Sequence, residues 1–154
     1  MDNQFNEELA RISAEALSTL GFMFPAGDPD PALKVPGEDA PAVTVTFHGP
    51  IHGSLDLKVS ADLLPVLAAN MTGSDSPPSE PEQWDALGEM LNIICGNMLP
   101  LLTDAKAVYD VAAPRRCRGT PDHAGQRLVG STGLPMEVGQ VELALYVNEP
   151  VAVA

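Results

Sequence analysis

Basic residues are scarce in this chain of 154 residues. Eight Lys and Arg stand against 21 Asp and Glu, which gives a formal net charge of −13. Binding to nucleic-acid phosphates requires a concentrated basic surface, so this balance argues against a nucleic-acid partner. Arg115, Arg116 and Arg118 form the one basic cluster. The cluster is typical of a solvated strand end, and reception of an acidic partner is the alternative interpretation.

Cysteine is nearly absent as well, and the chain shows neither a signal peptide nor an apolar run long enough to span a membrane. Cys95 and Cys117 are therefore expected to be inert thiols in a reducing cytoplasm, and not a disulfide or a nucleophile. We expect a cytoplasmic protein with no membrane partner.

Metal-ligand patterns are also missing. His48 and His52 flank a Gly-Pro turn, and His123 lies far away in a polar loop. No spaced Cys, Asp or Glu completes a ligand set around them, so we expect no intrinsic metal or cofactor. The chain has no Gly-rich phosphate loop, dinucleotide fingerprint or convincing nucleophile motif.

Aromatic residues are few, at 5%, although hydrophobic residues make up 45% of the chain. The core should therefore consist mostly of Leu, Val, Ile and Ala. The length suits one domain with a sizeable core, and we assign residues 1–154 to it.

Hydrophobic periodicity and turn residues predict an ordered series of helices and strands. Helices are expected at 4–21, ending at Gly21, at 61–72, and around 85–96, where Pro100 should kink or end the helix. Strands are expected at 43–48, 53–59 and near 106–118, 126–132 and 136–148. The polar, proline-rich segments 25–41 and 73–82 are expected to be irregular.

The strand patterns indicate how the sheet is covered. Val43, Val45 and Phe47 alternate with polar neighbours, which is typical of a strand half-buried on one face. Strands outnumber helices, and the connections are turns or short loops. The predicted fold class is α+β, with a largely antiparallel sheet packed by long helices.

The most informative segment is the helix around 85–96. At about 100° per residue, Asp85, Glu89, Asn92 and Gly96 fall within roughly 60° of one another. The opposite side collects Leu87, Leu91, Ile94 and Met98, with Trp84 and Leu101 at its margins. Asn and Gly are poor helix formers, so a face selected only for helix stability would carry other residues.

A polar face opposite an apolar stripe is also what any surface helix shows, and Gly96 could serve only to let a neighbouring element pack closely. Two features favour a docking surface instead. The four residues follow one stripe for three turns, and Ile93, Cys95 and Leu99 flank the stripe with little charge.

The spacing Asp85-x-x-x-Glu89-x-x-Asn92-x-x-x-Gly96 resembles the signature helix of the CheC/CheX/FliY phosphatases of bacterial chemotaxis and related two-component signalling. Further segments resemble that family in the expected order. They are the hairpin at 44–57, the short helix at 61–73, and the strands at 109–114 and 139–143.

Double-motif members of that family carry the signature on two long helices. The same spacing ending at Gly21 places Ala10, Ala14 and Leu17 where Asp, Glu and Asn should stand. The chain therefore resembles the single-motif CheX type, and this resemblance implies a homodimer joined through sheet edges. We expect the alternating strand at 141–147 to pair with a copy of itself.

The resemblance implies an aspartyl-phosphate phosphatase whose partner is a phosphorylated response regulator. Asn92 would hold the attacking water, because an amide can both donate and accept without adding charge. Glu89 would pair with the regulator's lysine, Asp85 would orient at the rim, and Gly96 would allow close approach. Any Mg²⁺ is expected in the partner.

Met98 and Pro100 depart from the family pattern just beyond the signature, and could alter docking. Two other functions remain open. One is an adaptor that captures a phosphorylated regulator without hydrolysing it, and the other is a structural domain of a motor-switch or signalling complex.

Overall fold

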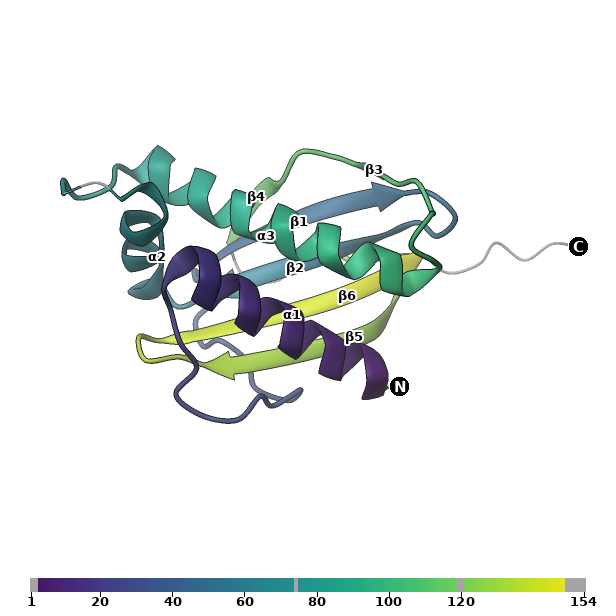
Figure 1. Cartoon of the computed structure of the whole chain (residues 1–154), viewed down its shortest axis with the longest axis horizontal. Coiled ribbons are helices and arrows are strands. Elements are labelled where there is room, and N and C mark those ends of the chain that lie inside the picture. Colours follow the sequence, from purple (N-terminus) through teal and green to yellow (C-terminus); the bar gives the residue numbers. More distant parts are fainter. Residues whose placement is uncertain (1–2, 74, 119–120, 149–154) are drawn as a thin grey trace, which may run out of the picture.

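The computed structural model describes residues 3–73, 75–118 and 121–148. Three helices and six strands follow one another along these ranges (Figure 1). In chain order they are α1 (Asn3–Gly21), β1 (Pro41–His48), β2 (Gly53–Val59), α2 (Leu63–Thr72), α3 (Glu80–Leu102), β3 (Asp110–Val111), β4 (Arg115–Arg118), β5 (Gln126–Pro135) and β6 (Gln140–Asn148).

The strands form one antiparallel sheet in the order β3-β1-β2-β6-β5, with β4 also paired to β1. The helices cover one face of this sheet. α3 lies over β1 and β2, α1 lies over β6 and β5, and α2 sits at one end (Figure 1). The predicted α+β fold is thereby confirmed. No helix in the described ranges has the length and apolar character needed to cross a bilayer.

The core lies between the helices and the sheet. Aliphatic side chains dominate it, as the composition predicts, and Phe47 is its largest fully buried member. Val43, Val45 and Phe47 point toward the helices and are buried. Burying each such side chain contributes about 1.5–3 kcal/mol to folding, so this layer supplies most of the stability.

The opposite face of the sheet, here called the far face, is more covered than predicted. Thr44 is buried as well as its neighbours Val43 and Val45, so β1 is not half-buried on one face only. Loop residues pack over this side. The backbone N–H of Val35 donates to Glu142 on β6 over 2.8 Å, and Lys34 approaches the same carboxylate. Loop residues therefore cover the far face of the sheet, and the alternation of apolar residues within a strand could not predict this.

Both ends of α3 differ from the prediction. α3 begins at Glu80, inside the segment expected to be irregular, because Ser79 and Glu82 form a reciprocal capping box. It also runs to Leu102, so Pro100 lies in the last turn and does not end the helix there. The ring removes one backbone hydrogen bond, to the carbonyl four residues earlier, and only Leu101 and Leu102 follow it in the helix.

The strand expected near 106–118 starts only at Asp110 and is interrupted between β3 and β4. Both short strands lie end to end along the outer side of β1. Pro114 stands in the interruption, and a proline has no N–H to donate to a sheet. β5 and β6 correspond to the strands predicted near 126–132 and 136–148. β5 is three residues longer than predicted, and β6 begins four residues later, at Gln140.

The expectation that strand 141–147 pairs with a copy of itself is wrong, because β6 lies inside the sheet between β2 and β5. The free side of β5 is also engaged. The N–H of Ser131 donates to Asn6 of α1 over 2.7 Å, and Asp30 pairs with Gly133 through both backbone groups. The homodimer itself stays a prediction, and the edge formed by β3 and β4 is the side of the sheet left for it.

Candidate functional site

Helix α3 holds its orientation through its apolar face. Leu87, Leu91, Ile94 and Met98 are all fully buried against the sheet and the other helices, as predicted. Leu101 differs, since 42% of it is exposed. The helix is thus fixed in rotation, and this determines which residues it presents to solvent.

Asp85, Glu89, Asn92 and Gly96 are all exposed on the outer side of α3, and we call them the motif ridge. Residues three or four apart on a helix have Cβ atoms about 5–6 Å apart, so neighbours along the ridge can act on one ligand. Within the described ranges no hydrogen bond or ion pair engages the side chains of Asp85, Glu89 and Asn92. The predicted ridge is present, and its polar groups are available.

A shallow hollow of about 250 Å³ lies along one side of the ridge, toward β4. Its lining comprises Val43, Trp84, Asp85, Gly88, Glu89, Asn92, Pro114 and Arg116. The guanidinium carbon of Arg116 lies 5.5 Å from the Trp84 ring centroid, a cation–π distance. A Cβ on Gly88 would lie 3.3 Å from Pro114, so the glycine lets the β3–β4 connection pack closely.

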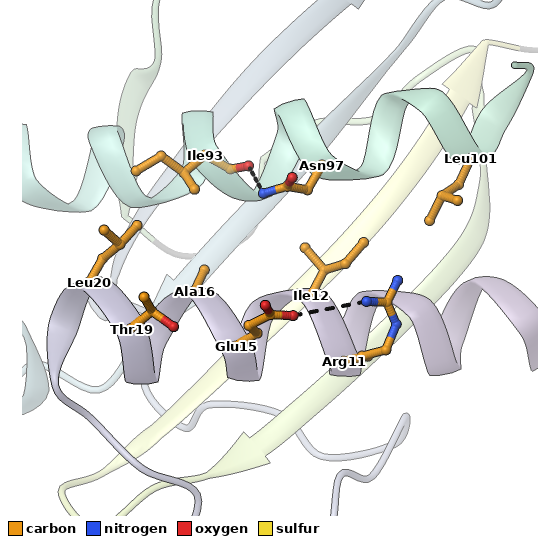
Figure 2. A pocket seen from close by; sticks show the side chains of 9 residues that line it. All are labelled: Arg11, Ile12, Glu15, Ala16, Thr19, Leu20, Ile93, Asn97 and Leu101. Atoms are coloured by element: carbon orange, nitrogen blue, oxygen red, sulfur yellow. Dashed lines mark hydrogen bonds and ion pairs between the residues drawn. The ribbon is translucent and has the colours of Figure 1, made fainter. Parts of the chain in front are cut away.

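A second hollow of about 290 Å³ lies along the other side of the ridge, between α1 and α3 (Figure 2). Ile12, Ala16 and Leu20 project from α1 toward Ile93 and Leu101 of α3, as Figure 2 shows. This groove explains the exposure of Leu101, which lines it without being covered by α1. The amide of Asn97 donates to the Ile93 carbonyl over 3.0 Å and so bonds to its own helix.

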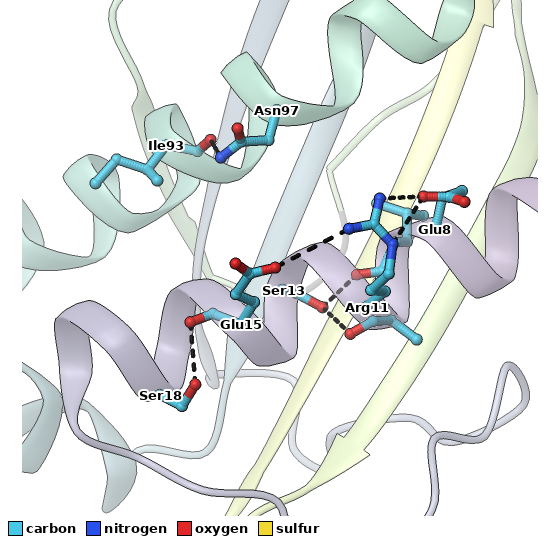
Figure 3. A network of polar contacts seen from close by, with 9 residues as sticks. Glu8, Arg11, Ser13, Glu15, Ser18, Ile93 and Asn97 are labelled. Atoms are coloured by element: carbon cyan, nitrogen blue, oxygen red, sulfur yellow. Dashed lines mark hydrogen bonds and ion pairs between the residues drawn. The ribbon is translucent and has the colours of Figure 1, made fainter.

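Helix α1 offers no second ridge. Ala10 and Leu17, at two of the positions where a second motif would place Asp and Asn, are buried in the core. The outward polar residues of α1 pair with one another (Figure 3). Arg11 donates to Glu8 and lies 4.0 Å from Glu15, and the hydrogen bond to Glu8 raises the pKa of the guanidinium. The charged side chains of α1 at this surface are therefore engaged with one another.

A polar cluster on the far face was not predicted. His123 Nε2 contacts Asp56 Oδ2 at 2.5 Å, and its ring stacks on Tyr146 with centroids 3.5 Å apart. The other ring nitrogen lies 2.8 Å from Gln126 Oε1, which also accepts from Ser54 over 3.1 Å. We call these five residues the far-face cluster. The loop that carries His123 is folded onto the sheet and is not merely a polar loop.

Burial raises the pKa of Asp56, which is only 7% exposed. Thr44 and His123 act in the opposite direction and lower the pKa of Asp56, and the charge of Glu142 adds to the rise. A sequence signal for this group did exist, because Ser54 and Asp56 are polar residues in a strand flanked by apolar ones. Their partner His123 comes from a distant segment, so the strand pattern could not identify it.

Neither thiol suits nucleophilic chemistry. Burial raises the pKa of Cys95 to about 12, and burial followed by the charge of Asp56 raises the pKa of Cys117. Thiolate is the reactive form, so both cysteines stay protonated and unreactive near neutral pH. Within the ranges described, no three His, Cys, Asp or Glu side chains gather as a metal-binding group.

Solved structures of chemotaxis proteins share this fold. CheX from Vibrio vulnificus matches with a TM-score of 0.74 at 17% identity, covering 94% of this chain and 97% of that one. A chain of the CheX–CheY–BeF₃–Mg²⁺ complex from Borrelia burgdorferi matches at 0.67 and 16%, covering 94% and 98%. FliY from Thermotoga maritima matches at 0.53 and 13%, covering 96% and 91%. The fold is therefore that of the CheX, CheC-like and FliY class of chemotaxis proteins.

Within that class, the family described as chemotaxis phosphatase CheX matches residues 41–129. This range is more than half of the chain and includes the motif ridge, and the chain belongs to the CheX family. The resemblance seen in the sequence is confirmed. No curated protein sequence matches the chain.

Proposed function

We propose that this protein is an aspartyl-phosphate phosphatase that dephosphorylates a CheY-like response regulator in chemotaxis or related two-component signalling. The observation that carries the proposal is the motif ridge, whose acid and amide are exposed, adjacent and unengaged within the described chain. Membership of a family described as chemotaxis phosphatases supports it. So does the CheX–CheY complex among the similar structures.

The reaction asks little covalent chemistry of the protein. Water attacks phosphorus, the bond from phosphorus to the aspartyl oxygen breaks, and the products are inorganic phosphate and a free carboxylate. Phosphoryl transfer of this kind is accelerated mainly by positioning and charge stabilisation. The task for the ridge is therefore to place one water in line with the leaving carboxylate.

Asn92 is the residue proposed to hold that water. Its amide can accept a hydrogen bond from the water and donate one to a phosphoryl oxygen, without bringing negative charge to an anionic group. Glu89, one turn earlier, would pair with a lysine of the regulator and set the register of docking. Asp85 would orient the partner at the rim, and the missing side chain of Gly96 would let the partner's backbone approach.

The protein is proposed to need no metal of its own, and Mg²⁺ would be held by the phosphorylated partner. An adaptor that binds the regulator without hydrolysis is the second candidate. The uncovered groove between α1 and α3 favours it, because an apolar hollow serves binding more than chemistry (Figure 2). The rate of phosphate loss separates the two.

The test is decay of a phosphorylated regulator from the same organism, with and without this protein. Asn92→Ala should lose about 100-fold of the acceleration, the size of effect expected when a reacting group is misplaced. Glu89→Ala should instead raise the protein concentration for half-maximal effect by about tenfold, equivalent to about 1.4 kcal/mol of docking. Both variants should unfold within about 0.5 kcal/mol of wild type, since both residues are exposed.

Asn97→Ala is the matched control. It removes the same amide from the same helix, but Asn97 bonds to the Ile93 carbonyl and lies on the α1 side of the ridge. It should keep the wild-type rate at saturating protein. Full activity in Asn92→Ala would contradict the mechanism, and regulator binding by wild type without accelerated decay would establish the adaptor.

A further inference from the structure

An acidic protein that acts on a phosphorylated protein faces a repulsion problem. The chain carries a net charge of −13, and the motif ridge itself contributes Asp85 and Glu89. The phosphoryl group and the carboxylates that bind a metal beside it are also anionic. A local positive charge at the docking surface would offset this repulsion and orient the partner.

Among the residues that the structure describes, Arg116 is the one cation that lines the hollow beside the ridge. It pairs in the sheet with Val43, whose side chain points to the helix layer, so Arg116 is on the same side as α3. Its guanidinium lies over Trp84, and Glu89 and Asn92 line the same hollow. The charge is thus held a short distance from the residues proposed to act on the phosphoryl group.

Its neighbour Arg115 faces the other way, because successive residues of a strand point to opposite faces. Arg115 pairs with Thr44 and lines a separate hollow on the far face together with His123. The same strand therefore carries two exposed arginines, one beside the motif ridge and one remote from it.

Arg116 also differs from the arginine on α1. Arg11 is occupied by Glu8 and Glu15 of its own helix (Figure 3). In the part of the chain that the structure describes, no carboxylate lies within ion-pair distance of Arg116. The cation–π contact with Trp84 leaves the N–H donors of Arg116 available for an anion.

We propose that Arg116 is a docking residue that receives the acidic surface surrounding the phosphorylated aspartate of the partner. The proposal rests on the proposed function, and it adds Arg116 and the requirement for a positive charge at this position. A guanidinium presents a planar fork that matches carboxylate and phosphate oxygens, so the expected contact is with an anionic side chain or a phosphoryl oxygen.

The experiment measures binding of the phosphorylated regulator to variants made in the Asn92→Ala protein, in which the phosphate should persist. Arg116→Ala should weaken binding about tenfold and reduce its salt dependence, because a charge contact has been lost. Arg116→Glu should weaken it further, and Arg116→Lys should recover only part of the affinity. Arg115→Ala removes an equal charge from the same strand and should bind within twofold of its parent.

Thermal unfolding of each variant identifies any loss caused by misfolding, and Arg116→Lys keeps the test valid if Arg116→Ala is unstable. Equal binding by Arg116→Ala and its parent, with active wild type, overturns this proposal and leaves the phosphatase intact. If binding depends on Arg116 but the wild-type protein does not accelerate hydrolysis, the phosphatase proposal is contradicted and the docking role of Arg116 is supported. A change in self-association alone, seen by light scattering, would assign Arg116 to a contact between two copies and overturn the proposal.

Discussion

The motif ridge and the far-face cluster are two polar groups on opposite sides of the same sheet. In the far-face cluster, His123 contacts both Asp56 and Gln126, and Asp56 is buried. In the motif ridge, Glu89 and Asn92 are exposed and engage no other side chain within the described ranges. Polar groups that satisfy one another stabilise the chain that contains them, whereas groups left unengaged on a rigid helix are available to a partner.

The two glycines of α3 show the same difference. A side chain at Gly88 would press against Pro114, so this glycine has a reason within the chain. A Cβ at Gly96 would meet no atom within 4 Å in the described structure. Glycine costs about 1 kcal/mol relative to Ala inside a helix, and nothing nearby in the fold offsets this cost at Gly96. The absence of a side chain at Gly96 therefore favours a role in contact with a partner molecule.

The largest effect on stability is expected at His123. His123→Ala removes the stack on Tyr146 and leaves Asp56 buried without its partner, which should lower the free energy of unfolding by about 3 kcal/mol. Dephosphorylation measured where the variant is still folded should stay within twofold of wild type. His52→Ala is the control. The His52 side chain is exposed, and among the described residues it contacts the side chain of His48, so the substitution should change stability by no more than about 0.5 kcal/mol.

If the far-face cluster also served the reaction, His123→Ala would reduce the rate beyond its loss of folded protein. Chemical denaturation followed by circular dichroism, together with the decay assay at a temperature well below the unfolding midpoint, separates these outcomes. If His123→Ala unfolds like wild type, the contacts of the far-face cluster are not stabilising, and the difference drawn between this cluster and the motif ridge is contradicted.

A smaller effect, visible as a pH dependence, is expected at Asp56. The pKa of Asp56 is raised above the ordinary value of 3.8, mainly by burial, so the folded protein binds this proton more tightly than the unfolded chain. Its contribution to stability is complete below that value and is lost as pH rises through the raised pKa. Asp56→Asn keeps the shape and cannot titrate, so its unfolding free energy relative to wild type should increase across that window.

Urea unfolding of both proteins at a series of pH values from 3 upward measures this difference. Every other titratable group is common to the two proteins, so the groups that do not interact with Asp56 cancel in the comparison. Parallel stability curves would mean that Asp56 titrates alike in the folded and unfolded chains, and that burial does not raise its pKa in the folded protein.

The smallest effect on stability is expected at Gly96, and it has the opposite sign. Gly96→Ala should raise the free energy of unfolding by about 0.5–1 kcal/mol, because alanine favours a helix and finds open space there. It should nevertheless weaken docking of the phosphorylated regulator, seen as a higher concentration for half-maximal decay. Gly88→Ala should gain less or lose stability, since Pro114 must move. A stabilised Gly96→Ala with unchanged docking would show that the glycine is not a clearance for the partner.

The helix α3 and its ridge could be predicted because the residue pattern that defines them is local in sequence. The 3.6-residue period separates the buried leucines from Glu89 and Asn92 without reference to the rest of the chain. The same holds for the alternating strands β1 and β6, whose inward residues the pattern identified. Fold class followed from the order of these segments.

Features that depend on contacts between distant segments could not be read in this way. His123 and Asp56 are 67 residues apart in the sequence. The loop that carries His123 has no periodic pattern that would predict its contact with Asp56. The position of β6 inside the sheet depends on strand order, which alternation does not encode, and so the expected pairing at 141–147 was wrong. Arg116 was recognised only as part of a basic cluster, because its position beside Trp84 requires β4 to pair with β1.

The depth to which α3 is anchored has a thermodynamic consequence for recognition. Its inner face is packed into the core while its outer face carries the ridge, so the backbone under Glu89 and Asn92 is already ordered before any partner arrives. Association then restricts mainly side-chain rotamers, and the entropy lost on binding should be small for the area covered. The helix behaves as a preorganised template, and a partner can be recognised through rapid rigid-body encounters without a folding step.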